Sequence, residues 1–192
     1  MDAKAALTYP GEEQTQHVSF SDQHRIHLRV YGLPAPQGSK KAYVVKNRAV
    51  MREASDHVGP WRSQVAMAAR LAVKAYPYPL TFPIRDQVAV EYVFLFPRPK
   101  SHFGSGSRSH VLRADSPYYV SEKNKGDFEK LLRSTNDGLS YTTGGALLYD
   151  DSLVVALRGN SEKRYCSNGE LPGAILVITP ASTWPTSAWP RS

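Results

Sequence analysis

The stretch GDFEKLLRSTNDGLSYTTGGALLYDDSLVV, residues 126–155, decides the fold because a helix pattern is followed there by a strand pattern. The helix face that should be buried recurs at a spacing of three and four residues, at Phe128, Leu131, Leu132, Thr135 and Leu139. Asp127 suits the N-cap, where its carboxylate would accept bonds from the free amides of the first turn. The apolar residues 153–157 predict a strand, which begins just after Asp150 and Asp151.

Two acidic pairs flank the expected helix, Asp127 with Glu129 and Asp150 with Asp151. Residues two apart in a regular helix point in different directions, so Asp127 and Glu129 converge only if Asp127 is still extended. Side chains alternate across a strand, so only one member of the second pair need face the first pair. Because Mg²⁺ prefers hard oxygen ligands, three convergent carboxylates would form a magnesium site.

The same four acids also have a purely structural interpretation. Asp is common at an N-cap, Glu in a first turn interacts favourably with the helix dipole, and Asp-Asp before a strand is an ordinary turn. Spacing alone favours this structural interpretation over a metal site.

The composition of the chain favours a polyanionic partner. The 192 residues include 24 Lys and Arg against 17 Asp and Glu, a net charge of +7. Cys166 is the single cysteine, which excludes a disulfide framework and a thiolate zinc site and predicts a reducing, cytoplasmic setting. No apolar run reaches the roughly 18 residues of a membrane span, so no membrane partner is expected.

One α+β domain is expected over residues 25–179, with a flexible leader at 1–24 and a flexible Pro/Ser/Trp tail at 180–192. Its architecture should be a mixed β-sheet with two main helices. The first helix should begin near Pro60 and end before Pro77. Strands are expected at residues 26–33, 42–45, 49–51, 86–96, 118–120, 153–157 with an extension toward 165, and 173–179.

Two basic segments are candidate contacts for nucleic acid. The turn at residues 34–41 ends in Lys40 and Lys41. The loop at residues 97–117 is long for a compact domain, and such loops are usually functional or disordered. Its basic residues include Arg98, Lys100 and Arg108. Each segment either contacts the phosphate backbone of DNA or is solvated without a ligand.

The central stretch resembles the signature of the RusA-like Holliday junction resolvases, which are crossover junction endodeoxyribonucleases. That family has Asp-x-Asp-Asn-Leu-x-Lys, then Asp-Ala-Leu, then Asp-Asp-x-x-Val. The corresponding segments here are DFEKLLR from Asp127, DGL from Asp137 and DDSLVV from Asp150. The likeness is close over residues 127–155 and extends loosely to residues 30–41.

The resemblance implies a role for each matching residue. Asp127, Glu129 and Asp151 match the three catalytic aspartates and would be metal ligands, with Asp150 beside them. The family's catalytic lysine falls on Arg133, and Lys130 stands where the family has Asn. Arginine does not release its proton at ordinary pH, so Arg133 would stabilise phosphate charge, and Lys130 is the rival for the lysine's role.

The resemblance also implies a Mg²⁺-dependent endodeoxyribonuclease, with Mn²⁺ as an alternative ion, that resolves four-way DNA junctions in recombination and repair. Its partners would be branched DNA and a second copy in a homodimer, with no small-molecule cofactor. A phage or prophage origin would fit, with action in the cytoplasm of a bacterial host cell. Two alternatives stay open: a non-catalytic DNA-binding protein, and a nuclease that prefers flaps or other branched DNA.

Overall fold

The computed structural model describes residues 24–38, 40–45, 48–53, 56–122 and 125–181. The predicted leader and tail lie almost entirely outside these residues. The main elements in chain order are β1 (Ile26–Tyr31), β2 (Lys40–Val45), β3 (Arg48–Glu53), α1 (Val58–Ala75), β4 (Val88–Phe96), α2 (Phe128–Leu139), β5 (Val154–Leu157), β6 (Glu162–Tyr165) and β7 (Gly173–Pro180). None of the described helices is long and apolar enough to cross a membrane.

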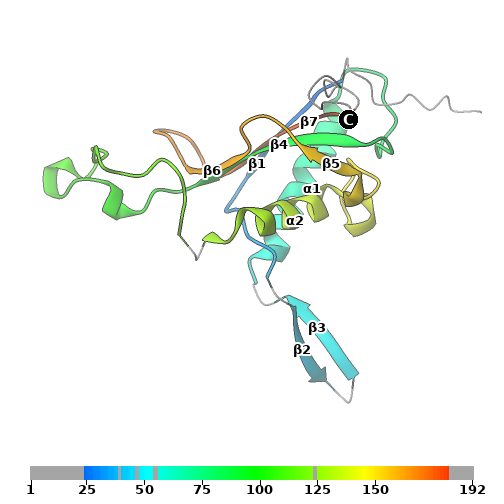
Figure 1. Cartoon of the computed structure of the whole chain (residues 1–192), viewed down its shortest axis with the longest axis horizontal. Coiled ribbons are helices and arrows are strands. Elements are labelled where there is room, and N and C mark those ends of the chain that lie inside the picture. Colours follow the sequence, from blue (N-terminus) through cyan, green and yellow to red (C-terminus); the bar gives the residue numbers. More distant parts are fainter. Residues whose placement is uncertain (1–23, 39, 46–47, 54–55, 123–124, 182–192) are drawn as a thin grey trace, which may run out of the picture.

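β4 is the central strand of a five-stranded mixed sheet (Figure 1). The order is β1-β7-β4-β5, and β6 also pairs with β4. β7 is antiparallel to both β1 and β4, whereas β5 and β6 are parallel to β4. The apolar character of β4 on both faces predicts a central position, and hydrogen bonding along both of its edges confirms it.

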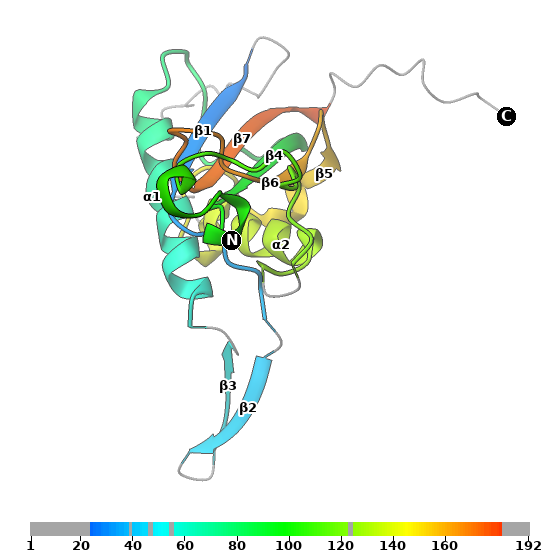
Figure 2. The ribbon, with the colours of Figure 1, turned by 90° about the vertical axis from the view of Figure 1, so that its left-hand side faces the viewer.

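Both helices pack on the same face of the sheet (Figure 2). Alternate residues of β4 from Val88 to Phe96 are buried there in one cluster with Trp61 of α1 and Leu131 of α2. Trp61 is 1% exposed, and its Nε1 donates to Thr135 Oγ1 at 3.1 Å, which joins the two helices. The predicted α+β class with a mixed sheet and two main helices is confirmed.

The strand predicted from residue 153 toward 165 is two strands that share one edge of β4. β5 pairs with residues 88–90 of β4, and β6 pairs with residues 93–96. Gly159 lies between the two strands with a φ of +60°. This left-handed conformation favours glycine and is incompatible with a strand, so the strand is interrupted there. The edge strand predicted at 118–120 is reduced to an isolated bridge between Tyr119 and Arg164.

Two segments project from this body in different directions (Figure 1). The first, called here the ribbon, is the hairpin of β2 and β3, which forms a separate two-stranded sheet. The second, called the arm, is residues 97–117. It is more regular than the predicted loop, because it contains two short 3-10 helices, Lys100–His102 and Gly106–Arg108, and a bridge between Phe103 and Leu112.

Candidate active site

The amino-terminal half of α2 is held by the linker at residues 33–38, which leads into the ribbon. The backbone N–H of Gln37 donates to the carbonyl oxygen of Lys130 at 2.9 Å. The hydroxyl of Ser134 donates to the carbonyl oxygen of Ala35 at 2.6 Å. These two bonds fix the start of α2 against the base of the ribbon.

The turn before α2 depends on Gly126. Its φ is +78°, and a Cβ built there would lie 2.3 Å from Pro36 of the linker, so both conformation and space favour glycine. Lys163 of β6 donates to the Gly126 carbonyl oxygen at 2.7 Å. Asp127 follows in extended conformation, with φ −74° and ψ 149°, as the sequence predicts for an N-cap residue.

The carboxylates of Asp127 and Glu129 are exposed and paired with cations of the same helix. Asp127 Oδ2 lies 3.0 Å from Lys130 Nζ, and Glu129 pairs with Arg133 one turn further on. The bond with Lys130 holds the pKa of Asp127 below its ordinary value. The prediction that the Asp127 carboxylate caps backbone amides is wrong, because it makes no such bond. The Asp127 carboxylate is bonded to the Lys130 ammonium instead.

The second acidic pair lies near the other end of α2. Asp150 caps the 3-10 turn Asp151–Leu153 by accepting a bond from the Ser152 N–H at 3.0 Å, and this interaction lowers its pKa. Thr142 Oγ1 donates to the other oxygen of Asp150 at 3.4 Å. Thr142 comes two residues after Ser140, the C-cap of α2, so Asp150 lies near the carboxyl end of the helix.

Asp127 therefore stands at the start of α2, whereas Asp150 is bonded to a residue beyond its carboxyl end. A helix of 12 residues is about 18 Å long, whereas Mg²⁺ ligands lie about 2.0–2.1 Å from the ion. Over the described ranges, no group of three His, Cys, Asp or Glu side chains is placed to hold a metal ion. The carboxylate chemistry suits Mg²⁺, but the single chain does not gather Asp127, Glu129 and Asp151 around one position.

Arg98, a predicted DNA contact, makes several contacts within the protein. Its guanidinium donates to the carbonyl oxygens of Cys166 at 3.1 Å and Pro117 at 2.9 Å. It also lies 5.4 Å from the centre of the Tyr165 ring. These contacts join both ends of the arm to the end of β6, so Arg98 holds the arm in place.

The other predicted DNA contacts lie on the projecting segments or on α2. Lys100 and Arg108 are exposed on the arm, where each belongs to one of the 3-10 helices. Lys40 and Lys41 begin β2 at the base of the ribbon. Lys130 is on the first turns of α2 beside Asp127.

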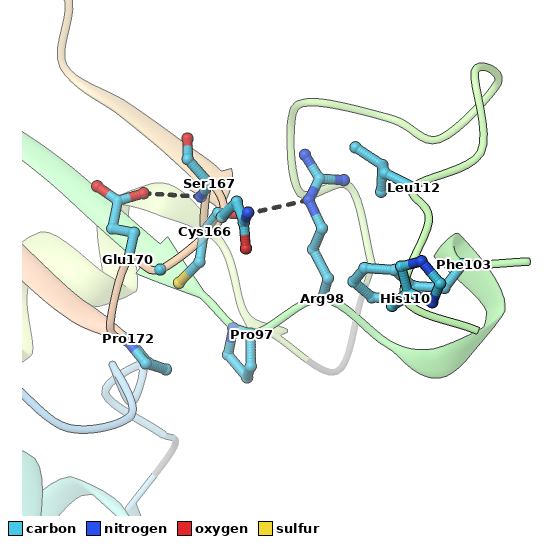
Figure 3. Close-up of a pocket in the computed structure, with 11 residues that line it drawn as sticks. Pro97, Arg98, Phe103, His110, Leu112, Cys166, Ser167, Glu170 and Pro172 are labelled. Carbon is cyan, nitrogen blue, oxygen red and sulfur yellow. Dashed lines mark hydrogen bonds between the residues drawn. The ribbon is translucent and has the colours of Figure 1, made fainter. Parts of the chain in front are cut away.

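A cavity of about 590 Å³ separates the arm from the turn between β6 and β7 (Figure 3). Its walls include Arg98, Phe103, Cys166 and Glu170. Cys166 is buried, and burial raises the pKa of its thiol, which disfavours a reactive thiolate. None of the four candidate acids lines the cavity, so it is separate from them.

Sequence reasoning missed two contacts that position α2. Asp137 forms an ion pair with Arg62 of α1, and the Tyr92 hydroxyl donates to Asn136 Oδ1 at 2.6 Å. Burial raises the pKa of Tyr92. Asp137 stands in the quoted DGL motif, but nothing in the pattern of α1 singles out Arg62, because the pairing depends on how the two helices cross.

The comparison with protein families defines the class of this protein. The model of the family described as "Endodeoxyribonuclease RusA" matches residues 33–175, about three quarters of the chain. The protein is therefore an endodeoxyribonuclease that acts on DNA. It belongs to the RusA family of Holliday junction resolving endonucleases, which depend on divalent metal ions. A search of the curated proteins and a search of the solved structures found no match.

Proposed function

We propose that this protein resolves four-way DNA junctions by Mg²⁺-dependent hydrolysis of phosphodiester bonds. The observation that carries the proposal is the family match, which spans both acidic pairs, the ribbon and the arm. The shape supports a branched substrate. The ribbon follows the linker that is bonded to the start of α2, and the arm projects from the body in a different direction (Figure 1). Two diverging projections suit two DNA arms better than one straight duplex.

We propose that Asp127 and Glu129 bind the metal ion at the start of α2. Asp151, with Asp150 beside it, would be the third ligand. A bound Mg²⁺ would stabilise charge on the phosphoryl oxygens and lower the pKa of a coordinated water; Mn²⁺ accepts the same ligands. Because the second pair lies near the far end of α2, its contribution requires movement of residues 150–153 or a second chain. The two pairs therefore need separate tests.

The proposed basic participants lie beside the first acidic pair. Arg133 and Lys130 are exposed and already lie within bonding distance of Glu129 and Asp127. Both can reach a phosphate at the same helix end, where Arg133 would stabilise phosphate charge. Lys100 and Arg108 on the arm and the lysines of the ribbon would contact the DNA backbone, and these contacts would be sensitive to salt.

We also propose a homodimer, because symmetric cuts in two strands of a junction need two active sites. A cytoplasmic location is supported by the single unpaired cysteine, Cys166, which is typical of a reducing compartment.

The deciding experiment is a cleavage assay on a synthetic four-way junction, with Mg²⁺, Mn²⁺ or EDTA. We expect cleavage with Mg²⁺ and none with EDTA. Flap and plain duplex substrates in the same assay measure the preference for junctions. Faster cleavage of flaps than of junctions would assign a different branched substrate, and equal cleavage with EDTA would exclude the metal.

A further inference from the structure

Two exposed tyrosines lie side by side near the second acidic pair. The rings of Tyr141 and Tyr149 are nearly parallel, with an interplanar angle of 14° and centroids 6.4 Å apart. The guanidinium of Arg85 lies over the Tyr149 ring, 4.0 Å from its centroid. Tyr141 is 59% exposed and Tyr149 is 39% exposed, so a large aromatic surface faces solvent. These three side chains are called here the tyrosine platform.

The backbone beneath the tyrosine platform is anchored to the core. The N–H of Tyr141 donates to the carbonyl oxygen of Leu148 at 2.7 Å, and the N–H of Tyr149 donates to the carbonyl oxygen of Ile84 at 2.8 Å. Leu148 and Ile84 are both buried in the main hydrophobic cluster. Since Arg85 directly follows Ile84, the residues that carry all three side chains are fixed to one another through the backbone.

The tyrosine platform adjoins the second acidic pair. Tyr149 directly precedes Asp150 in the sequence, and Tyr141 directly precedes Thr142. Thr142 Oγ1 donates to the carboxylate of Asp150 at 3.4 Å. A ligand bound on the platform would therefore lie close to Asp150 and to Asp151, which follows it.

The chemistry of the tyrosine platform fits the flat face of a nucleic-acid base. Bases stack on aromatic side chains, and arginine adds cation–π contacts to such sites. In a paired duplex the neighbouring base pairs cover these faces, and a base must leave the stack before a protein can contact its face. The family match shows that this chain acts on DNA. A branch point interrupts base stacking, so branched DNA offers accessible base faces that a straight duplex does not.

We infer that the tyrosine platform stacks on an unpaired base at the branch point of the DNA substrate. The inference rests on the proposed function, and it deepens that function by assigning recognition of the branch point to Tyr141, Tyr149 and Arg85. The stacked base would hold its strand beside Asp150 and Asp151. Because every base has a flat face, the platform would recognise the unpaired state and not the identity of the base.

The test is binding of the full-length chain to a synthetic four-way junction and to a plain duplex of the same length, in EDTA so that no cleavage occurs. Tyr141→Ala and Tyr149→Ala are each expected to weaken junction binding about 5- to 100-fold, the usual effect of removing a stacking ring. Duplex binding should change by less than about twofold, because the bases of a duplex stay stacked on one another. Equal losses on the two substrates would overturn the inference.

Conservative variants separate stacking from packing. Tyr149→Phe keeps the ring and should recover most of the affinity that Tyr149→Ala loses, whereas Tyr149→Leu keeps apolar bulk without a ring and should not. Full recovery by leucine would indicate a packing role and would overturn the inference. Thermal unfolding of each variant confirms that it is folded.

Tyr31→Ala is the matched control. Tyr31 is 58% exposed, and the Arg29 guanidinium lies 4.7 Å from its ring centroid, so its chemistry resembles that of Tyr149. It stands on β1, at the opposite edge of the sheet from β5, which follows the second acidic pair in the sequence. Its junction binding should equal that of the wild type, and a loss as large as that of Tyr149→Ala would show that the effect is not specific to the platform.

A double-mutant cycle between protein and DNA tests the contact itself. The junction is made with an abasic site in place of one nucleotide at the branch point, and each such position is tested in turn. At the stacked position, the missing base should weaken binding by the wild type more than binding by Tyr149→Ala, because that variant has already lost the contact. Additive losses at every position would exclude a stacked base.

The outcomes distinguish this inference from the proposed function. If the wild type binds and cleaves the junction but both alanine variants bind it with wild-type affinity, the inference alone is overturned. If the alanine variants change the oligomeric state and not the affinity, the tyrosine platform contacts a second copy of the chain, which also overturns it. A wild type that binds no branched DNA overturns both proposals.

Discussion

The candidate acids differ in what they contact within the protein. Asp127 and Glu129 make exposed ion pairs with residues of their own helix, with side chains 74% and 71% exposed. Such exposed pairs contribute little to folding, because water and salt screen them. Neutral substitutions there should leave the fold intact, so a large loss of activity would report on the reaction itself.

We expect Asp127→Asn and Glu129→Gln each to lower the cleavage rate more than about 100-fold while junction binding persists, because each removes a charge that a metal would require. Single-turnover cleavage and binding of the same junction measure this. Asp151→Asn in parallel shows whether the distant pair takes part. Asp115→Asn, which changes an exposed acid paired with Arg113 on the arm, is the control and should cleave normally. Normal cleavage by D127N would refute the ligand assignment.

At the level of the elements, Gly138 of α2 allows that helix to approach α1 closely. A Cβ built on Gly138 would lie 2.6 Å from Val65 Cβ and 2.9 Å from the Arg62 carbonyl oxygen. Val65 therefore occupies the space that a side chain at position 138 would need. The helices therefore cross close together, which lets Trp61 reach Thr135.

Gly138→Ala is expected to destabilise the protein by about 1–3 kcal/mol, because a well-packed contact must open to admit the methyl group. Met67→Ala is the control: its side chain is exposed on α1, so the substitution should change the stability by less than about 0.5 kcal/mol. Urea unfolding followed by circular dichroism compares the two. Adding Val65→Ala to G138A should relieve the clash. Equal stability of G138A and wild type would show that the helices separate at little cost.

At the scale of the whole molecule, the two projecting segments bear on which DNA substrate fits the protein. The ribbon and the arm extend from a compact body of one sheet and two helices (Figure 1). One chain presents one such pair of projections and one start of α2. If the protein makes two symmetric cuts, as proposed, a second chain would supply the second active site.

We expect sedimentation equilibrium to give a particle of twice the 21.3 kDa of the chain, at the concentrations that cleave junctions. The physical reason is the need for two active sites on one substrate. If a monomer makes both cuts at a concentration-independent rate, the homodimer is excluded.

The sequence by itself determined the features that depend on neighbouring residues. The periodicity around Leu131 predicted α2, and the apolar run of β4 predicted a central strand; both are confirmed. The hairpin of the ribbon also follows from local pattern, with strands two and three residues longer than predicted. Helix and strand periodicity are short-range properties, so a local window contains the information.

Only the tertiary structure decided how distant segments meet. Arg98 holds the arm because Cys166 and Pro117 are brought beside it. Residues 154–165 divide into β5 and β6 because both pair with one edge of β4. The acidic pairs lie near opposite ends of α2. Asp127 is its N-cap, whereas Asp150 accepts a bond from Thr142, two residues after the C-cap Ser140. Spacing along a sequence does not determine at which end of a helix a later segment packs, since that depends on the long-range contacts that bury the core.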